Sequence, residues 1–298
     1  MAREQRQVVL DVDDVTLRFG GVVALDQVSF KLYEGEILGM IGPNGAGKTT
    51  CFNAMTGVYR PTSGSITFGG RQVSGRKPHQ ITRMGIARTF QNIRLFPEMT
   101  ALENVLVGTD ARHKSSVVGV LFRMYRRRPK PEELPEVTSS SPVVSAWQQL
   151  RRRCAQIFGL SRHTLEERAA HKKAMALLEF AGVADRAEEL ARNLPYGYQR
   201  RLEIARALAT EPRLVCLDEP AAGFNPVEKQ QLLDLIRQIR DRGYTVLLIE
   251  HDMKLVMGVT DRIVVLEFGK KIADGPPSEV SRDPKVIAAY LGVPEDAA

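Results

Sequence analysis

The sequence predicts an α/β fold in which a parallel β-sheet is covered by helices on both faces. After about residue 199, helical segments alternate with short apolar runs, namely LVCLDE (214–219), TVLLIE (245–250) and RIVVLEF (262–268). This alternation is typical of parallel strands joined by crossover helices. Earlier in the chain, the apolar run EILGMI (36–41) is followed by a glycine-rich segment and then a helical segment. That order is typical of a phosphate-binding loop between a strand and a helix.

The composition is that of a folded globular chain. Of the 298 residues, 43% are hydrophobic and 26% are charged, which provides enough apolar material for a sizeable core and too much for a disordered chain. No window approaches the roughly 18 consecutive apolar residues of a membrane-spanning helix. The N-terminal MAREQRQVVL lacks the apolar segment of a secretory signal. We therefore expect a soluble, cytoplasmic-type chain.

The first 110 residues are predicted to begin with strands and continue with mixed elements. Apolar runs bounded by glycine-rich turns predict strands at VVLDV (8–12), VSFKL (28–32), EILGMIG (36–42), SITFGG (65–70) and IARTFQ (86–91). Helical segments are predicted from the glycine-rich segment through Met55, at HQITRMG (79–85), and at TALENVLVG (100–108), where Thr100 is the predicted cap.

Residues 115–162 interrupt this pattern. Two triple-arginine runs (126–128 and 151–153) flank PKPEELPEVTSSSP (129–142), a composition that predicts a linker or surface loop. The helical pattern returns at HTLEERAAHKKAMALLEFAG (163–182), with Gly182 as its predicted end. Further helices are predicted from Gln199 to Ala209 and up to Arg242, and no internal repeat is found.

The positive charge is confined to one segment. The chain has a net charge of +7, but residues 112–173 hold 14 Lys or Arg against 5 Asp or Glu, a net charge of +9. The rest of the chain holds 28 against 30, a net charge of −2. A nucleic-acid footprint over the whole molecule is therefore not expected. The basic segment itself can be a solvated surface, a contact with anionic lipid or a partner, or a nucleic-acid contact.

The cysteines do not indicate a disulfide framework or a zinc site. There are three, Cys51, Cys154 and Cys216, an odd number without metal-site spacing. Cys51 and Cys216 lie among apolar or small residues and are expected to be reduced core thiols.

The glycine-rich segment matches the pattern GxxxxGK[ST] from Gly42 to Thr49. Glycines let backbone N–H groups surround a phosphate, and the N-terminus of the following helix adds partial positive charge. Lys48 supplies a charge to the β- and γ-phosphates, and Thr49 supplies a hydroxyl to Mg²⁺. A chance glycine-rich turn is the alternative, but the strand before it and the helix after it are the context that nucleotide binding requires.

Polar residues at the ends of the apolar runs complete the predicted site. Asp218 and Glu219 end the run LVCLDE, and buried carboxylates at a strand end require a cation or polar partner. Asp218 is expected to hold Mg²⁺ through water and Glu219 to polarise the attacking water. His251 and Gln91 follow two other apolar runs. Each can be an ordinary structural residue, but ligand sites of α/β folds form at the C-terminal ends of the strands.

These segments resemble, in content and order, the nucleotide-binding domain of an ABC transporter. The segments are GPNGAGKTT (42–50), Gln91, LPYGYQRRLEIARAL (194–208), LVCLDEP (214–220) and IEHD (249–252). The resemblance covers about residues 8–110 and 165–292. Within that family, RTFQNIRLFPEMTALENVLVG (88–108) and DEPAAGFNP (218–226) are similar to the ATP-binding subunits of branched-chain amino-acid importers. Urea or amide importers and the lipopolysaccharide exporter ATPase match YGYQRRLEIAR and AAGFNP less well.

The resemblance implies a role for each site residue. Phe19 is in the position of the aromatic residue that stacks on adenine. The residues implied to bind ATP are Gly42, Pro43, Asn44, Gly45, Ala46, Gly47, Lys48, Thr49 and Thr50. Gln91, Asp218 and Thr49 are implied metal ligands, with Gln91 also touching the attacking water. Glu219, His251 and Gln91 are implied catalytic residues, with His251 contacting the γ-phosphate and bracing Glu219.

The signature motif departs from the usual LSGGQ. It comprises Leu194, Pro195, Tyr196, Gly197, Tyr198 and Gln199, and in this family it contacts the γ-phosphate of the other subunit in a dimer. Pro195 replaces the serine, so this position lacks both the hydroxyl and a backbone donor. Asn225 lies in a loop that normally carries Asp at the dimer interface.

The resemblance also implies an architecture and partners. We expect a single ABC-type P-loop NTPase domain over 8–292, with an N-terminal antiparallel β-subdomain and the nucleotide-binding core over about 8–91 and 205–292. A helical signature subdomain is expected over about 92–204, with the basic insertion at about 115–162. The chain has one phosphate loop and one signature, so it must dimerise, with a heterodimer favoured over a homodimer. The implied partners are a second ATPase subunit, two permease subunits at the cytoplasmic face of the membrane and, indirectly, an extracytoplasmic binding protein.

Two alternatives remain open from the sequence. One is a related urea or amide importer ATPase, or a lipid exporter ATPase. The other is a soluble ABC ATPase that acts on nucleic acid or ribosomes. Proteins of the second class usually carry two ATPase units or a long coiled-coil insert, and residues 115–162 are too proline-rich for heptads. No nucleic-acid partner is therefore expected.

Overall fold

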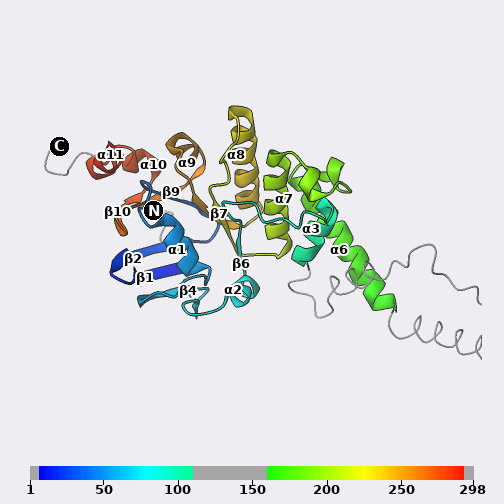
Figure 1. The fold of residues 1–298 in the computed structure, drawn as a ribbon, viewed down its shortest axis with the longest axis horizontal. Coiled ribbons are helices and arrows are strands. Elements are labelled where there is room, and N and C mark those ends of the chain that lie inside the picture. Colours follow the sequence, from blue (N-terminus) through cyan, green and yellow to red (C-terminus); the bar gives the residue numbers. More distant parts are fainter. Residues whose placement is uncertain (1–6, 110–159, 292–298) are drawn as a thin grey trace, which may run out of the picture.

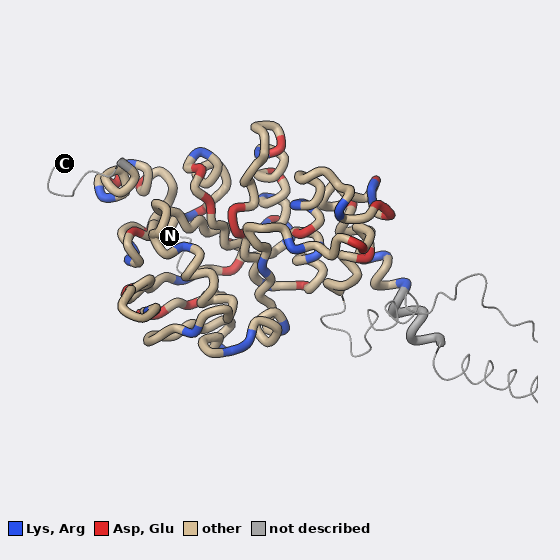
Figure 2. The backbone as a smooth tube through the Cα atoms, viewed as in Figure 1, with Lys and Arg blue, Asp and Glu red and all other residues tan. Residues whose placement is uncertain are grey.

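The computed structural model describes residues 7–109 and 160–291 (Figure 1). Almost all of the predicted basic insertion, about 115–162, therefore lies outside the described residues. Cys154 lies outside them as well. In the part of the chain that is described, no helix has the length and apolar character to cross a membrane. Figure 2 shows acidic and basic residues interspersed over this part of the chain.

A four-stranded antiparallel sheet forms the N-terminal part, with strand order β2-β1-β4-β5. Its strands are β1 (Val8–Phe19), β2 (Val22–Tyr33), β4 (Ser63–Phe68) and β5 (Arg71–Gln72). β1 and β2 pair over their whole length up to the Phe19–Val22 turn. The apolar pattern had predicted only the five-residue segments 8–12 and 28–32. In β1, the exposed Asp13 and Asp14 interrupt the apolar pattern and hide the rest of the strand.

The second sheet has six strands in the order β10-β9-β3-β8-β7-β6. The strands are β3 (Ile37–Ile41), β6 (Ile86–Arg88), β7 (Leu214–Asp218), β8 (Thr245–Ile249), β9 (Arg262–Glu267) and β10 (Lys270–Gly275). The first five run parallel to their neighbours, as predicted, and β10 is an added antiparallel edge strand. β3, β7 and β8 are buried at every residue. Buried parallel strands have this continuous apolar character.

The two faces of this sheet bury different clusters. Along β8, Val246 and Leu248 pack with helical residues, while Leu247 and Ile249 pack with α1 (Lys48–Met55) and the antiparallel sheet. Successive side chains of a strand alternate between faces, so β8 contributes to both clusters. One face is thus covered by helices, and the other by α1 and the antiparallel sheet (Figure 1).

The helices that cover the first face include α8 (Pro226–Asp241) and three helices grouped at one end of the molecule, α3 (Ala101–Thr109), α6 (Leu160–Phe180) and α7 (Tyr196–Ala209) (Figure 1). Two 3₁₀ turns, Ala184–Arg186 and Ala191–Asn193, connect α6 to α7. The predicted cap is confirmed, because the Glu103 N–H donates to Thr100 Oγ1 at 3.1 Å and the Thr100 N–H to Glu103 Oε2 at 2.8 Å. Such a reciprocal pair is a capping box.

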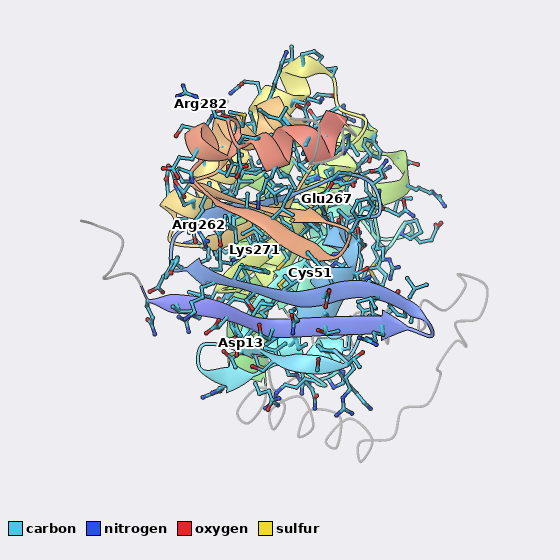
Figure 3. All side chains as sticks on the ribbon, turned by 90° about the vertical axis from the view of Figure 1, so that its left-hand side faces the viewer. Asp13, Cys51, Arg262, Glu267, Lys271 and Arg282 are labelled. Atoms are coloured by element: carbon cyan, nitrogen blue, oxygen red, sulfur yellow. The ribbon has the colours of Figure 1, made fainter. Side chains whose placement is uncertain are left out.

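The remaining helices are α2 (Pro78–Met84), α9 (Met253–Val259), α10 (Pro277–Val280) and α11 (Pro284–Leu291). The last two and β10 were not predicted from the sequence. Figure 3 shows the β9–β10 hairpin lying along strands β1 and β2, with Lys271 on the hairpin and Asp13 on the antiparallel sheet. The Asp26 N–H donates to Gly269 O at 2.8 Å and joins the two sheets near the hairpin turn.

Three predicted strand ends were one to three residues too long. β6 ends at Arg88, β7 at Asp218 and β8 at Ile249, so Gln91, Glu219 and His251 follow the strands in irregular backbone. α7 begins at Tyr196, three residues earlier than predicted. Propensity does not favour a helix start at YGY, but contacts with residues 223–228 fix it.

Candidate functional site

The glycine-rich loop Gly42–Gly47 follows β3 and leads into α1 at Lys48. A Cβ atom at Gly42 would lie 2.0 Å from the carbonyl oxygen of Leu266, and one at Gly47 would lie 2.8 Å from that of Ala24. Both residues have positive φ, 150° and 98°, a region open mainly to glycine. Gly45 also has positive φ, with open space where a Cβ would be. The loop is thus closely packed against the protein on one side and open on the other.

Lys48 is buried beneath this loop. Its ammonium group donates hydrogen bonds to the carbonyl oxygens of Gly42 at 2.7 Å and Pro43 at 2.9 Å. Burial lowers the pKa of Lys48, and the carboxylates of Glu219 and Asp218 act in the opposite direction. The neighbouring Thr49 side chain is exposed, and Thr50 is half-buried.

Asp218, at the end of β7, is buried and paired with Arg88. The Arg88 Nη2 atom lies 2.8 Å from Asp218 Oδ2, and its Nη1 donates to Asn53 and Thr56 on and just after α1. Burial raises the pKa of Asp218, and the hydrogen bond and charge of Arg88 oppose this rise. The sequence analysis missed Arg88. A charged residue within the run IARTFQ was the available signal.

Glu219, His251 and Gln91 meet at one point. The Gln91 side-chain amide donates to Glu219 Oε2 at 3.0 Å, and His251 Nδ1 lies 3.8 Å from the same oxygen. The structure therefore brings together three residues that are distant in the sequence. The imidazole is exposed, with 60% of its side-chain surface accessible, whereas the corresponding value for Glu219 is 20%. The site thus has an open side.

A second carboxylate, Glu250, lies behind Glu219 and was not singled out from the sequence. Its side chain is 1% exposed, and its Oε1 accepts the Ala221 N–H at 2.8 Å. Its Oε2 lies 3.8 Å from His251 Nδ1. Burial raises the pKa of Glu250, while hydrogen bonds from Ala221 and His251 and the charge of His251 lower it. The signal in the sequence was an acidic residue directly after the apolar run VLLI (246–249).

The loop that carries Gln91 is held by α7. Arg200 is completely buried and donates to the carbonyl oxygens of Phe90 at 2.6 Å and Gln91 at 2.7 Å. Glu203, also buried, accepts N–H groups of Phe90 at 3.4 Å and Arg94 at 3.3 Å. The two side chains pair with each other at 3.1 Å. Two side chains of α7 therefore hydrogen-bond to the backbone on both sides of Gln91.

The signature residues Leu194–Gln199 span the start of α7. Pro195 is the exposed N-cap residue and provides no side-chain cap, while Gln199 Nε2 donates to Leu194 O at 2.8 Å. The Tyr196 ring packs edge-on against Phe224 at 6.1 Å between centroids. Gly197 and Tyr198 are half-buried at the start of the helix. None of the hydrogen bonds made by described residues 194–199 reaches the phosphate loop.

Asn225, also singled out from the sequence, caps α8. Its side chain accepts the Glu228 N–H at 2.9 Å, and the Glu228 carboxylate accepts the Asn225 N–H at 2.9 Å. This exchange gives the loop before α8 a fixed entry geometry.

Phe19 lies at the end of β1 and is 46% exposed. Its ring meets Tyr59 edge-on at a centroid distance of 5.0 Å, and Tyr59 is itself partly exposed. Tyr59 was not predicted as a site residue. Its position in the loop after α1 becomes adjacent to Phe19 only in the folded chain.

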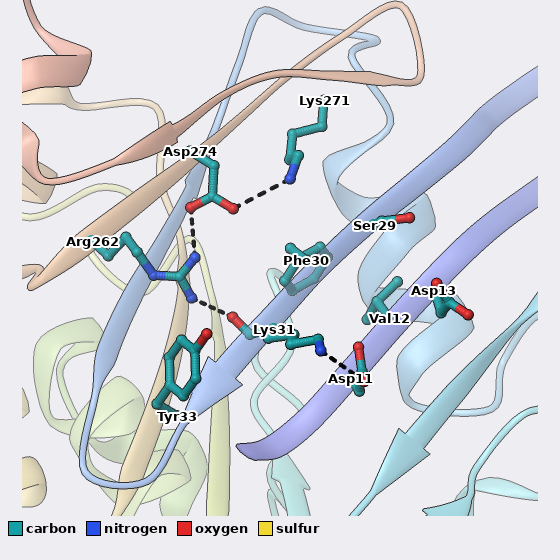
Figure 4. Close-up of a pocket in the computed structure, with 10 residues that line it drawn as sticks. All are labelled: Asp11, Val12, Asp13, Ser29, Phe30, Lys31, Tyr33, Arg262, Lys271 and Asp274. Carbon is teal, nitrogen blue, oxygen red and sulfur yellow. Dashed lines mark hydrogen bonds and ion pairs between the residues drawn. The ribbon is translucent and has the colours of Figure 1, made fainter. Parts of the chain in front are cut away.

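A separate pocket lies between the two sheets, lined by β1, β2, β9 and β10 (Figure 4). Its volume is about 310 Å³, and its lining residues include none of the predicted site. Most of its charges are paired within the pocket, with Asp274 binding Arg262 at 2.5 Å and Lys271 at 3.3 Å, and Asp11 3.7 Å from Lys31. The pocket is thus not the nucleotide site.

The geometry is suited to phosphoryl chemistry. A glycine-rich loop and a helix N-terminus bind phosphate, and a carboxylate with amide and imidazole neighbours can orient and deprotonate water. Within the described residues, no cluster of three or more His, Cys, Asp or Glu side chains could hold a metal ion alone. Any divalent cation here would need phosphate oxygens or water as further ligands.

Comparison with known proteins agrees with this geometry. Residues 25–222 match the sequence profile "ABC transporter", and residues 270–296 match "Branched-chain amino acid ATP-binding cassette transporter". The chain is 44% identical to the high-affinity branched-chain amino acid transport ATP-binding protein LivG of Salmonella typhimurium, over 96% of this chain and 98% of that protein. The corresponding protein BraF of Pseudomonas aeruginosa is also 44% identical, over 95% of this chain and 98% of its own length.

Solved structures give the same result for the fold. A crystal structure of the ADP conformation of an ATP-binding cassette of an ABC transporter has a TM-score of 0.73 and 30% identity, covering 96% of this chain and 99% of its own. A nucleotide-free ATP-binding cassette gives a TM-score of 0.72 and 28% identity, covering 95% and 99%. The chain therefore belongs to the ABC transporter family, among its branched-chain amino acid transport ATP-binding proteins.

Proposed function

We propose that this chain binds and hydrolyses ATP to power the uptake of branched-chain amino acids by an ABC importer. The observation that carries the proposal is the convergence of Gln91, Glu219 and His251 beside the phosphate loop of Lys48. The length of chain shared with LivG and BraF supports the substrate class.

In this proposal, the phosphate loop binds the β- and γ-phosphates of ATP. Backbone N–H groups of residues 44–50 and the N-terminus of α1 attract the phosphates, and Lys48 adds a positive charge. Its ammonium group exchanges the carbonyl oxygens of Gly42 and Pro43 for phosphate oxygens. Phe19 stacks on adenine, with Tyr59 supporting its ring from the side.

Hydrolysis requires a water molecule in line with the bond between the β- and γ-phosphates. Glu219 accepts a proton from this water while the water oxygen bonds to the γ-phosphorus. The bond between the γ-phosphorus and the ADP oxygen breaks. Gln91 orients the water and holds Glu219 Oε2, and His251 contacts the γ-phosphate. The 3.0 Å and 3.8 Å approaches to Glu219 Oε2 support this division of roles.

The donor groups are suited to Mg²⁺. This ion prefers oxygen ligands and commonly takes one or two from the protein and the rest from phosphate and water. Thr49, Asp218 and Gln91 supply a hydroxyl, a carboxylate and an amide oxygen on adjoining segments. When bound, Mg²⁺ neutralises charge on the phosphate oxygens. Asp218 is held by Arg88, so its carboxylate is already oriented.

The chain functions as one component of a transporter complex with permease subunits. We propose two permeases, contacted from the cytoplasmic face of the membrane, and an extracytoplasmic binding protein that acts through them. We further propose a single domain over 8–292 in which about 92–204 form a helical signature subdomain. The contacts that α3, α6 and α7 make with one another support this division.

We also propose that the second ATPase subunit is a different chain. A signature motif completes the opposite ATP site in this family, and Pro195 gives this chain a weakened signature. The phosphate loop and carboxylates of this chain match the usual family motifs. Its own ATP site therefore needs a partner subunit that supplies a complete signature.

The decisive experiment is to reconstitute the assembled transporter in liposomes and to measure ATP hydrolysis and leucine uptake together. We expect hydrolysis to be stimulated by the binding protein loaded with leucine, isoleucine or valine, and uptake to require ATP. Stimulation by urea, amides or lipid instead would overturn the assignment of the substrate class.

A further inference from the structure

Glu250 is a buried carboxylate for which the proposed mechanism gives no role. It directly follows β8 and precedes His251, and it is 1% exposed. A buried acid needs specific partners, because leaving water is costly for its charged form. The groups that satisfy Glu250 therefore indicate what it does.

Its partners are backbone groups of the two segments that carry the catalytic residues. Oε1 accepts the N–H of Ala221, two residues after Glu219, at 2.8 Å. Oε2 accepts the N–H of His251 at 3.3 Å. One carboxylate thus connects the segment that follows β7 to the segment that follows β8.

The segment after β7 needs such a connection because Glu219 has an unusual backbone conformation. Its φ is +45°, in the left-handed region that residues other than glycine seldom adopt. Such conformations persist where the surrounding structure enforces them, and they concentrate at functional sites. Here the turn is held on both sides. The Glu219 N–H donates to Ile249 O at 3.0 Å, and the Ala221 N–H donates to Glu250.

We propose that Glu250 is a positioning residue that holds Glu219 in this conformation, so that its carboxylate meets Gln91 and His251. The inference rests on the proposed role of Glu219 as the base. The length of the Glu250 side chain is what matters, because it places an oxygen at the Ala221 N–H. Its negative charge is not required for this role. The same hydrogen bond stabilises the carboxylate in its buried position.

Three substitutions of Glu250 separate the effect of side-chain length from the effect of charge. Glu250→Gln retains the length and an amide oxygen for the Ala221 N–H, but it removes the charge and the acceptor of the longer His251 N–H contact. Glu250→Asp retains the charge but is one methylene shorter and cannot reach Ala221 from the same backbone. Glu250→Leu removes both. Glu36→Leu is the matched control, because Glu36 is also a buried acid, 4% exposed, and its partners are Arg262 and the Tyr33 N–H instead of site residues.

The assembled transporter carrying each variant is assayed for kcat and for the KM of ATP, with thermal unfolding and nucleotide titration of the purified subunit. We expect Glu250→Leu and Glu250→Asp to lower kcat about tenfold or more, with the KM of ATP within about twofold of wild type. Glu250→Gln is expected to retain kcat within about threefold. Glu36→Leu is expected to lower the melting temperature without a fall in kcat of the folded protein.

A reversed order, with Glu250→Asp like wild type and Glu250→Gln impaired, would assign the effect to charge and overturn the proposal. So would wild-type kcat in all three variants. If Glu250→Leu does not fold, the Asp and Gln variants still decide. The double variant Glu219→Gln/Glu250→Asp is expected to be no slower than Glu219→Gln alone, because Glu250 acts through Glu219. If Glu219→Gln itself remains active, the proposed function fails separately from this inference.

Discussion

The proposed base, Glu219, makes the most direct prediction at the scale of single residues. Glu219→Gln retains a side chain of the same size beside Gln91 but replaces the carboxylate with an amide, which cannot accept the proton of water. We expect ATP binding to persist and turnover to fall by about 10²–10⁴-fold. Nucleotide titration and steady-state hydrolysis measure the two effects separately.

Lys48→Ala is the control for this experiment, because it removes charge from the phosphate site and should weaken nucleotide binding itself. A Glu219→Gln variant that hydrolyses ATP within about threefold of the wild-type rate would contradict the assignment of the base.

The two described thiols provide a second residue-scale prediction. Cys51 and Cys216 are buried, and burial raises the pKa of each to about 12. The thiolate is the reactive form, so at pH 8 only about one thiol in 10⁴ is ionised. In a Cys154→Ser background, we expect neither thiol to react with a disulfide reagent in the folded protein. Denatured protein should react at both, and equal rates in the two states would show that the thiols are accessible.

The sequence predicted the residues that lie in contiguous motifs better than those that act across the fold. The phosphate loop, Asp218 and Glu219 could be found because their chemistry is concentrated in short segments. Arg88, Tyr59 and Glu250 could not, because their partners, Asp218, Phe19 and Ala221, are distant in sequence. Nothing in a single segment reports such pairings. The left-handed backbone at Glu219 was equally invisible, since glutamate has no preference for it.

At the scale of elements, the contacts of Arg200 and Glu203 in α7 with the Gln91 loop predict that losing one of these charges lowers the stability of the fold. Arg200→Met leaves Glu203 buried without its ionic partner, which is expected to cost about 3–5 kcal/mol of unfolding free energy. Arg200→Met/Glu203→Leu removes both charges and should recover part of this loss. Urea denaturation measures the two effects. Arg201→Met, on the next residue of the same helix, changes a partly exposed side chain bonded to Gln231 and should have little effect.

The same variants report on the loop itself. In the double variant, the N–H groups of Phe90 and Arg94 lose their acceptor on Glu203, so their hydrogen exchange should accelerate while exchange in β7 stays slow. Unchanged protection at these two amides would show that α7 does not hold the loop.

Element boundaries were predicted well where local signals agree with packing. Thr100 and Gly182 mark helix ends through a capping box and a positive φ of 70°. The start of α7 at Tyr196 was missed because it depends on contacts with Phe224 and Gly223. The parallel pairing of the buried strands followed from alternation, but the edge strand β10, whose residues are half-buried or exposed, carries no comparable apolar signal.

At the scale of the whole molecule, proline in place of the signature serine at position 195 predicts unequal ATP hydrolysis at the two sites of a dimer. Pro195 is the exposed N-cap of α7 and offers neither a hydroxyl nor an N–H. One lost charge-assisted hydrogen bond costs about 1.5–3 kcal/mol, or roughly ten- to a hundredfold in rate if it acts in the transition state. In the proposed dimer each signature completes the opposite site, so the loss is expected at the partner's nucleotide. We therefore expect a heterodimer in which the phosphate-loop site of this chain is the faster one.

The test restores serine with Pro195→Ser in the assembled transporter and blocks the glutamate that follows each Walker B aspartate, one subunit at a time. Serine at an N-cap also stabilises the helix by about 0.5–2 kcal/mol relative to alanine. Pro195→Ala is therefore compared, because it restores the backbone N–H without the hydroxyl. We expect Pro195→Ser to raise hydrolysis at the partner's site and Pro195→Ala to raise it less. An unchanged rate there, or rapid hydrolysis by this chain as a homodimer, would mean that Pro195 does not weaken the signature and that the two sites are not divided in this way.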